Sequence, residues 1–312
     1  MPNIGGSITA VGDMPAMTHR GLLAALLVAA LWGFNFSVIK LGVAELDPFV
    51  LAALRFALCA VPLVFALPKP PVAWRWLVAY GLAFGVGTWG LLMCAMRLGL
   101  TPALAAWLLQ ASAFLTPLLA WAWLREPMRS AQRLGAAVAL LGFGLVLFAT
   151  AGHMPVTGLL LAPMAAGSLS VANVVVRRSG VQAMLAFMVW SCLFAPLPLL
   201  ALALMQGGFE VLQTLPAQLA RPVALGSLAV QVYPVTLLGY WVWNRLRARY
   251  GGATVVPVAL LVPVFALVFG DWVFGRWPSA GEWAGMAVIG LGLVISLRPA
   301  RSSAPASRQR RA

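Results

Sequence analysis

The stretch that decides the fold is "GLLAALLVAALWGFNFSVIKLG", residues 21–42. Its first half contains only small or apolar residues, and the same run continues through Trp32 and Asn35 to Lys40. A run of about 20 mostly apolar residues is long enough to cross a bilayer as a helix. The stretch therefore predicts a spanning helix with an asparagine in its interior, where lipid offers no hydrogen-bond partner.

The composition of the whole chain places it in the same class. Of its 312 residues, 62% are hydrophobic and only 9% are charged, whereas about a quarter of a soluble domain is charged. We therefore expect an all-α membrane protein. The three cysteines, Cys59, Cys94 and Cys192, all fall inside apolar runs, and this odd number predicts neither a disulfide framework nor a metal cluster. We expect no cofactor and no metal.

Apolar runs long enough to span a bilayer recur along the chain, separated by short segments that hold most of the charge. They predict ten transmembrane helices, at residues 21–40, 48–67, 75–97, 102–124, 131–150, 157–176, 182–206, 222–244, 252–274 and 283–298.

Lys and Arg residues are divided unequally between the two sets of alternate connections. Sixteen lie in the tails and in the connections after helices 2, 4, 6 and 8, whereas the other set has only Lys40, Arg97, Arg221 and Arg276. Cytoplasmic connections carry the excess of basic residues, so we expect both termini to be cytoplasmic. This distribution also argues against nucleic acid as the reason for the net charge of +14.

The two ends of the chain read as tails. Residues 1–19 are small and polar and predict a disordered N-terminal tail, whereas residues 299–312 form a basic cytoplasmic tail. The second tail either reinforces the orientation of the chain or binds anionic lipid headgroups.

The two halves of the sequence resemble each other. "NFSVIKLG", which begins at Asn35, aligns with "NVVVRRSG", which begins at Asn173, and helices 5 and 10 both carry two glycines seven residues apart. We expect one repeat at residues 20–150 and a second at 155–298. Each repeat has five spans, an odd number, so the second must be inverted in the membrane, as is common in transporters.

Four stretches carry a resemblance to a known family: "LWGFNFSVIKLG", "LAALRFAL", "LLQASAFLTPLLAWAWLREP" and "GYWVWNRLRARYGGATVVPVALLVPVFAL". They identify the chain as similar to the EamA type of the drug/metabolite transporter superfamily, and within it to the bacterial exporters of O-acetylserine and cysteine. The resemblance covers residues 20–298. Such proteins often have a Gly-Glu pair after helices 4 and 9, whereas here Arg125 precedes Glu126 and Trp277 occupies the expected place of the second glutamate.

Polar residues inside the spans predict a solute path between the two repeats. At helical spacing they form stripes on single faces, such as Trp107 with Gln110 in helix 4, or Tyr233, Thr236 and Tyr240 in helix 8. Amides, hydroxyls and aromatic rings suit a small amphipathic solute, but interhelical hydrogen bonds explain each residue equally well. The candidate substrate-binding residues are Asn35, Arg55, Trp89, Trp107, Gln110, Asn173, Tyr233 and Tyr240.

Arg55 is the most informative single residue, because an arginine near the middle of a spanning helix costs about 3 kcal/mol unless it finds water or a partner. It could hold a substrate carboxylate in a bidentate contact, bond the exposed carbonyls of a kinked neighbouring helix, or extend outward to the membrane surface. The sequence leaves these three roles open.

The sequence contains no phosphate-binding loop and no nucleophile with an evident base, and its two histidines, His19 and His153, lie outside the spans. We therefore expect no enzyme. Asp271, near the outer end of helix 9, is the one acidic candidate for proton coupling inside a span, so export down the solute gradient is favoured.

The resemblance implies an exporter of small amphipathic metabolites, such as amino acids or their derivatives, in the bacterial inner membrane. It would act by alternating access through a central cavity, as a monomer or homodimer with the lipid bilayer as its surroundings. An importer or exchanger of the same superfamily, or an exporter of drugs or aromatic compounds, is the alternative.

Overall fold

The computed structural model describes residues 17–150 and 155–296, and these ranges contain helices and short loops without a strand. The expected tail at 299–312, and all but the last three residues of the one at 1–19, lie outside the described residues, as does His153. The first helix begins at His19 because the Thr18 hydroxyl caps it by accepting from the Gly21 amide at 3.2 Å.

The first half of the chain forms five spans. Span 1 is α1 (His19–Glu45), span 2 is α2 (Pro48–Val64), span 3 is α3 (Trp74–Tyr80), η1 (Gly81–Gly90) and α4 (Leu91–Arg97), span 4 is α5 (Pro102–Leu109) and α6 (Ser112–Leu124), and span 5 is α7 (Ser130–Thr150). Span 3 is continuous, although its middle, η1, is π-helical.

The second half follows the same plan. Span 6 is α8 (Val156–Ser179), span 7 is α9 (Met184–Ser191), η2 (Cys192–Phe194) and α10 (Pro196–Gly207), span 8 is α12 (Pro222–Val230), η3 (Gln231–Leu238) and α13 (Gly239–Tyr250), span 9 is α14 (Gly252–Val255), η4 (Val256–Leu261) and α15 (Val262–Phe274), and span 10 is α16 (Ala280–Ser296). Eight of the ten spans are long enough and apolar enough to cross a membrane, and α2 and α16 are shorter apolar helices. The expectation of an all-α membrane protein is confirmed.

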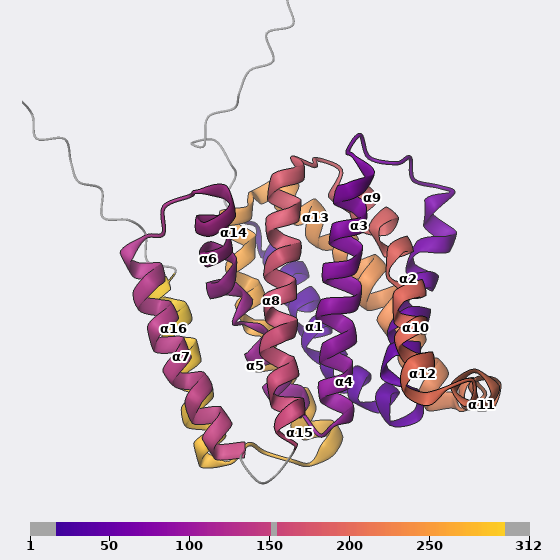
Figure 1. Cartoon of the computed structure of the whole chain (residues 1–312). Helices are drawn as coiled ribbons and strands as arrows, with labels where there is room; N and C mark the ends of the chain where they lie inside the picture. Colours follow the sequence, from indigo (N-terminus) through magenta and orange to yellow (C-terminus); the bar gives the residue numbers. More distant parts are fainter. Residues whose placement is uncertain (1–16, 151–154, 297–312) are drawn as a thin grey trace, which may run out of the picture.

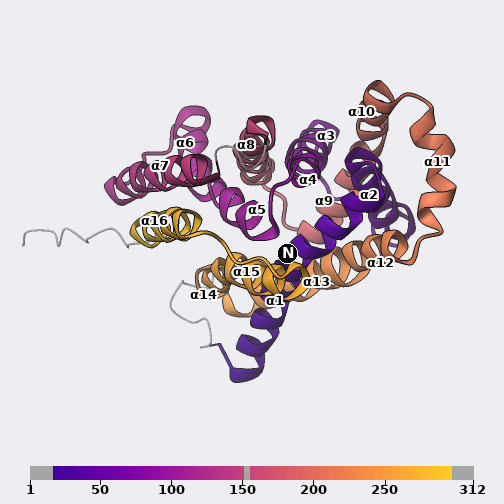
Figure 2. The same ribbon diagram turned by 90° about the horizontal axis from the view of Figure 1, so that it is seen from below.

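The helices stand side by side and form two rows when viewed along their axes (Figures 1 and 2). Spans 1, 8, 9 and 10 form one row and spans 3, 4, 5 and 6 the other, with α2 and α10 at one end. Because each half contains an odd number of spans, equivalent helices of the halves run in opposite directions. We call the face with Arg125, Arg177 and Arg245 the basic face, and the other, with Lys40 and Arg276, the opposite face.

Spans 5 and 10 form an antiparallel pair at the edge of the bundle (Figure 1). Gly135 lies against the backbone of Gly292, and Gly142 lies against the backbones of Gly285 and Ile289. The repeated glycines that the sequence shows in both helices therefore allow the two backbones to approach closely, as small residues do between membrane helices.

The ends of equivalent helices also match. α6 ends in a left-handed residue, Arg125 (φ 56°), and α15 ends in the left-handed Gly275 (φ 61°). The next spans begin alike, since Gln132 accepts from the Arg129 amide at 2.9 Å and Glu282 accepts from the Ser279 amide at 2.7 Å. This equivalence aligns Glu126 with Arg276. The expectation that Trp277 occupies the place of the second glutamate is therefore wrong. That alignment matched the prolines after the two helices instead of the residues at which the helices end.

One helix was not predicted. α11 (Glu210–Leu219) connects spans 7 and 8 and lies outside the bundle, at the opposite face (Figure 2). Val211, Leu215 and Leu219 lie on one side of it and pack against the core. Its brevity and its mixed composition made it read as a loop, because an apolar side of this size does not produce a membrane-length run.

The glycine contact between spans 5 and 10 predicts unequal effects of the same substitution. We expect Gly142→Ala to lower the free energy of unfolding by about 1–3 kcal/mol, because the added Cβ would lie 2.7 Å from the Ile289 nitrogen and 2.8 Å from the Gly285 oxygen. Unfolding in detergent micelles or bicelles measures the effect.

Gly144→Ala is the matched control, because this residue lies two positions further along the same helix, on another side of it, with no atom within 4 Å of an added Cβ. It should leave the stability unchanged or raise it by up to about 1 kcal/mol, since alanine favours a helix more than glycine does. Equal losses in the two variants would contradict the proposed close packing.

Candidate functional site

Arg55 of α2 is buried at the centre of the bundle, with only 1% of its surface exposed. Its Nη2 donates to the Thr236 hydroxyl at 3.1 Å and its Nη1 donates to the Gln231 amide oxygen at 3.4 Å. Both partners belong to η3 of the second repeat. Of the three roles open to Arg55, extension to the membrane surface is therefore excluded, and its hydrogen-bond partners are side-chain oxygens.

An aromatic ring from the first repeat covers the guanidinium group. The Cζ atom of Arg55 lies 4.4 Å from the centre of the Trp89 ring of η1, and the Trp89 ring lies 6.4 Å from that of Phe36 in α1. A cation over the face of tryptophan is a favourable arrangement, especially away from water. Arg55 therefore joins η1 to η3.

No carboxylate neutralises Arg55 among the described residues. Their two ion pairs join Arg177 to Glu126 at 2.7 Å and Arg221 to Glu45 at 2.8 Å, and both pairs lie near the surface. The titratable groups near Arg55 are Cys59, Tyr240 and Cys192. A buried charge is costly unless it is paired, so the structure holds at its centre an arginine supported only by neutral groups.

The two helices that hold Arg55 share an irregularity. η1 and η3 are π-helical segments at equivalent positions of spans 3 and 8. In each, a threonine hydroxyl donates to the carbonyl five residues earlier, Thr88 to Ala83 at 3.0 Å and Thr236 to Gln231 at 2.7 Å. π-helical turns inside α-helices are rare and occur frequently at functional sites. Their presence in both repeats at this depth marks the centre of the molecule as the candidate site.

Local sequence accounts for part of the geometry of η3. Pro234 lies inside it and has no amide hydrogen to donate. The Trp32 indole nitrogen of α1 donates to the Val235 carbonyl at 3.2 Å and so satisfies an acceptor within the segment. The Trp32 ring also packs against Tyr240, with ring centres 5.3 Å apart. Span 1 of the first repeat thereby supports the irregular part of span 8.

A cavity of about 1000 Å³ opens to the basic face. Its lining includes Tyr80 from span 3, Asn173 from span 6 and Asn244 from span 8, so both repeats contribute to it. Tyr80 stacks on Phe84 with ring centres 5.1 Å apart, and the Phe84 ring lies 6.1 Å from that of Trp89, which covers Arg55. The charged residues of the lining are all basic: Arg177, Arg245 and Arg247. The cavity therefore leads from a positively charged entrance towards Arg55.

The opposite face is closed more tightly. Lys40 at the end of span 1 donates to the Met96 carbonyl of span 3 at 2.5 Å, and Arg97 of span 3 donates in return to the Val43 carbonyl of span 1. A smaller cavity, of about 210 Å³, remains at this face and is lined by Lys40, Asp271 and Arg276.

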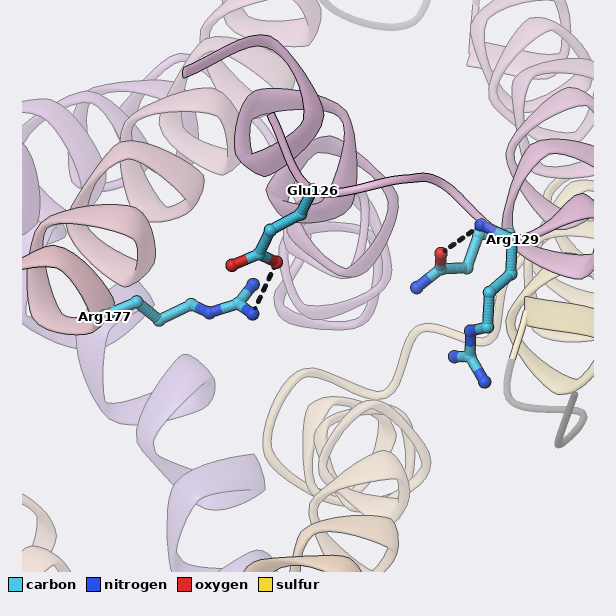
Figure 3. A network of polar contacts seen from close by, with 4 residues as sticks. Glu126, Arg129 and Arg177 are labelled. Carbon is cyan, nitrogen blue, oxygen red and sulfur yellow. Dashed lines mark hydrogen bonds and ion pairs between the residues drawn. The ribbon is translucent and has the colours of Figure 1, made fainter. Parts of the chain in front are cut away.

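Figure 3 shows the polar contacts at the basic face beside span 4. Arg177 at the end of span 6 reaches Glu126, which follows span 4, and Asn173 donates to the Thr116 hydroxyl of span 4 at 3.3 Å. Glu126 of the first repeat therefore has its partner in the second. The aligned residue Arg276 is instead close to Lys40, a like charge, so the two faces of the molecule differ.

The structure brings some of the candidate residues together. Arg55, Trp89 and Tyr240 share the central site. Asn35 is 1% exposed, lies one residue before Phe36, and its Oδ1 has no hydrogen-bond partner among the described residues. Asn173 lines the basic-face cavity rather than the centre.

Three other candidates lie elsewhere. The Trp107 ring lies beside Gly290 of span 10, and Gln110 lies at the break between α5 and α6. Tyr233 is 59% exposed on the outer surface. The expected common face of Tyr233, Thr236 and Tyr240 is wrong, because a π-helical turn contains more residues than an α-helical one and so shifts the spacing.

Two residues of the central site were missed as candidates. Gln231 and Thr236 hold Arg55, yet neither was selected for this role. Gln231 could have been found by the criterion that selected Asn35, since it is a lone amide in an apolar run. Thr236 was recognised only as a member of a stripe. It donates to a carbonyl five residues earlier, and α-helical spacing brings together only residues three or four apart, so this contact could not be predicted from the sequence.

A model of the EamA-like transporter family matches the chain twice, over residues 19–148 and 156–298. The chain belongs to this family. Each half matches one copy of the family model, as the repeated arrangement of the helices leads one to expect. This EamA-like protein is therefore a multi-pass membrane protein of a transporter family, with a small molecule as its substrate.

Several relatives have descriptive names. The EamA-like protein is 33% identical over 288 residues to a probable amino-acid metabolite efflux pump of Salmonella typhimurium, with 90% of this chain and 96% of that protein covered. It is 31% identical to the probable amino-acid metabolite efflux pump of Escherichia coli, with the same coverage. A solved crystal structure matches with a TM-score of 0.58 at 20% identity, covering 93% of this chain and 100% of the other. The last likeness supports the fold alone.

The double role of Thr236 predicts that it contributes to stability. We expect Thr236→Val to lower the free energy of unfolding by about 1–2 kcal/mol, because the variant loses the hydroxyl that accepts from Arg55 and donates to the Gln231 carbonyl. Unfolding in detergent micelles measures the change.

Thr214→Val serves as the control, because the exposed Thr214 hydroxyl also donates to a carbonyl of its own helix, that of Glu210 at 2.9 Å. Its loss should change the stability by no more than about 0.5 kcal/mol. A Thr236→Val variant as stable as this control would contradict the structural role of Thr236.

Proposed function

We propose that this EamA-like protein exports small amphipathic metabolites, amino acids or derivatives similar to O-acetylserine and cysteine, across the bacterial inner membrane. The observation that carries the proposal is the cavity of about 1000 Å³ at the basic face, which both repeats line and which leads towards Arg55. The names of the two relatives described above support the same substrate class.

The basic face is the cytoplasmic face in this proposal. Connections on that side carry most of the Lys and Arg residues of the chain, and basic connections remain in the cytoplasm. The cavity therefore opens to the compartment from which an exporter loads its solute. Arg177 at its entrance is paired with Glu126, so Arg245 and Arg247 give the entrance its positive potential, which favours solutes that carry a carboxylate.

Alternating access would require the two faces to exchange their states. In the present arrangement the opposite face is closed by the reciprocal contacts between spans 1 and 3, whereas the basic face is open. The inverted halves supply the required symmetry, since each can adopt the conformation of the other. One chain contains both halves, so a monomer suffices, and a homodimer would contain two independent paths.

The solute path in this proposal runs from Asn173 past Tyr240 to Arg55, Trp89 and Asn35. Its chemistry is that of solute binding rather than catalysis. Trp107 beside Gly290 and Gln110 at the break of span 4 are left as candidates for packing or for another state of the transport cycle, whereas Tyr233 faces outward. An exporter of aromatic compounds would use the same path with a different selectivity.

Efflux from proteoliposomes preloaded with labelled cysteine, O-acetylserine or neutral amino acids tests the function. We expect saturable efflux of at least one solute, slowed about two- to tenfold by Asn35→Ala through the loss of a hydrogen bond. Tyr233→Ala is the control and should transport at the wild-type rate, because this side chain faces outward. If folded protein exports no amino acid, the proposed substrate class is wrong, and aromatic compounds or sugars are the next classes to test.

The energy source gives a further prediction. We expect wild-type efflux to be indifferent to an imposed pH gradient and Asp271→Asn to behave identically, because Asp271 lies at the small opposite-face cavity rather than beside Arg55. Initial efflux rates with and without the gradient measure this. A stimulation by the gradient that disappears in Asp271→Asn would instead establish a proton link through this residue.

A further inference from the structure

Three buried polar atoms on neighbouring spans have no hydrogen-bond partner among the described residues. They are Nε of Arg55, Nε1 of Trp89 and Oδ1 of Asn35. A buried donor or acceptor that is left unpaired is destabilising, and such groups in a native structure call for an explanation. Two of the three are donors and the third is an acceptor, so a ligand that carries both an acceptor and a donor would satisfy them.

These atoms belong to residues on three helices that pack against one another at the centre of the bundle. The Arg55 guanidinium lies 4.4 Å from the Trp89 ring, and that ring lies 6.4 Å from the ring of Phe36, the neighbour of Asn35. Trp32, one turn before Asn35, contacts Tyr240, which lies near Arg55. Spans 1, 2 and 3 therefore supply the unpaired atoms, and span 8 supplies the wall opposite them.

The charge at this point defines the ligand further. Arg55 is the single cation there among the described residues and has neutral partners, so the ligand that completes the site carries one negative charge. A phosphate would require several basic residues, whereas a carboxylate matches the planar fork of one guanidinium group. The free oxygen of Asn35 is an acceptor, and an ammonium group supplies the donor that it lacks.

We propose that Arg55 is the receptor for the carboxylate of the transported solute, while the Asn35 amide oxygen accepts from its ammonium group. This inference rests on the proposed function and narrows its substrate class to zwitterionic α-amino acids. Trp89 is a positioning residue that holds the guanidinium plane against its ring, with its indole nitrogen as a second donor.

Gln231 and Thr236 are positioning residues of the same site. Each offers a neutral oxygen to Arg55, and a carboxylate is the stronger acceptor for a guanidinium group. Thr236 also donates to the Gln231 carbonyl within η3. A solute carboxylate that replaces these oxygens breaks the hydrogen bonds between Arg55 and η3 of the second repeat. The ammonium group of the same solute contacts span 1 of the first repeat.

Counterflow of labelled cysteine into proteoliposomes tests the inference on unaltered protein. Unlabelled O-acetylserine, its methyl ester and its N-acetyl form serve as competitors, since the ester lacks the carboxylate and the amide lacks the ammonium group. We expect the ester to inhibit at least about tenfold more weakly than the free amino acid. Equal inhibition by acid and ester would overturn the assignment of Arg55.

Variants show which residues produce the preference for the free acid over the methyl ester. Arg55→Gln should abolish the preference for the acid over the ester, whereas Arg55→Lys should retain part of it because the charge remains without the fork. Arg221→Gln removes an exposed arginine at the opposite face and should keep the wild-type preference. Asn35→Ala should reduce only the preference for the free amine over the N-acetyl form. An undiminished acid preference in Arg55→Gln would overturn the proposal.

A binding measurement separates this inference from the proposed function. Propionate should produce a saturable change in tryptophan fluorescence in purified wild-type protein, and neither Trp89→Phe nor Arg55→Gln should show it, because Trp89 lies against the guanidinium group. If no amino acid is transported but this response persists, the proposed function fails and the carboxylate receptor stands. A wild-type protein without a saturable response to propionate would overturn the receptor.

Discussion

The structure depends on one constraint: inside a bilayer, every backbone polar group must find its hydrogen-bond partner within the protein. Helices meet this constraint along most of the chain, and the exceptions have specific solutions. Where η1 and η3 depart from α-helical geometry, Thr88 and Thr236 each donate to a carbonyl five residues earlier, and Trp32 donates to the Val235 carbonyl. The irregular segments are therefore supported structures rather than defects of the helices.

The centre of the molecule is a junction between the repeats. Arg55 comes from the first repeat, and its hydrogen-bond partners come from the second. At the basic face, Glu126 of the first repeat pairs with Arg177 of the second, and at the edge the glycines of span 5 meet those of span 10. Contacts across the two halves therefore occur at the surface, at the edge and at the centre, so a change of angle between the halves must alter all three.

Much of the fold could be predicted from the sequence because the bilayer imposes a simple rule on composition. Runs of apolar residues located all ten spans, and the paired glycines of helices 5 and 10 indicated the repeat. Single residues such as Asn35 and Arg55 were also recognisable, because a lone polar side chain in an apolar run is conspicuous. The spans followed from the hydrophobic pattern, and the repeat followed from the glycine spacing.

The site itself was only partly predictable, because its geometry depends on where a helix changes its period. Tyr233 was expected beside Tyr240 and lies outside, whereas Gln231 was overlooked and lies at the centre. α-Helical spacing cannot place residues across a π-helical segment, and the segment is stabilised by tertiary contacts such as that of Trp32. Likewise, the equivalence of Glu126 with Arg276 follows from the left-handed helix ends at Arg125 and Gly275.

The pairing of spans 5 and 10 also bears on how the chain is made. Gly135 and Gly142 are synthesised with the first repeat, but the backbone against which they pack belongs to the last span. A nascent first repeat must therefore reside in the membrane with this small-residue face still turned towards lipid. Its partner is synthesised only after the other nine spans, so the order of translation makes span 10 the element that completes this pairing. A chain truncated before this span would present an unpaired glycine face to the quality-control machinery of the membrane.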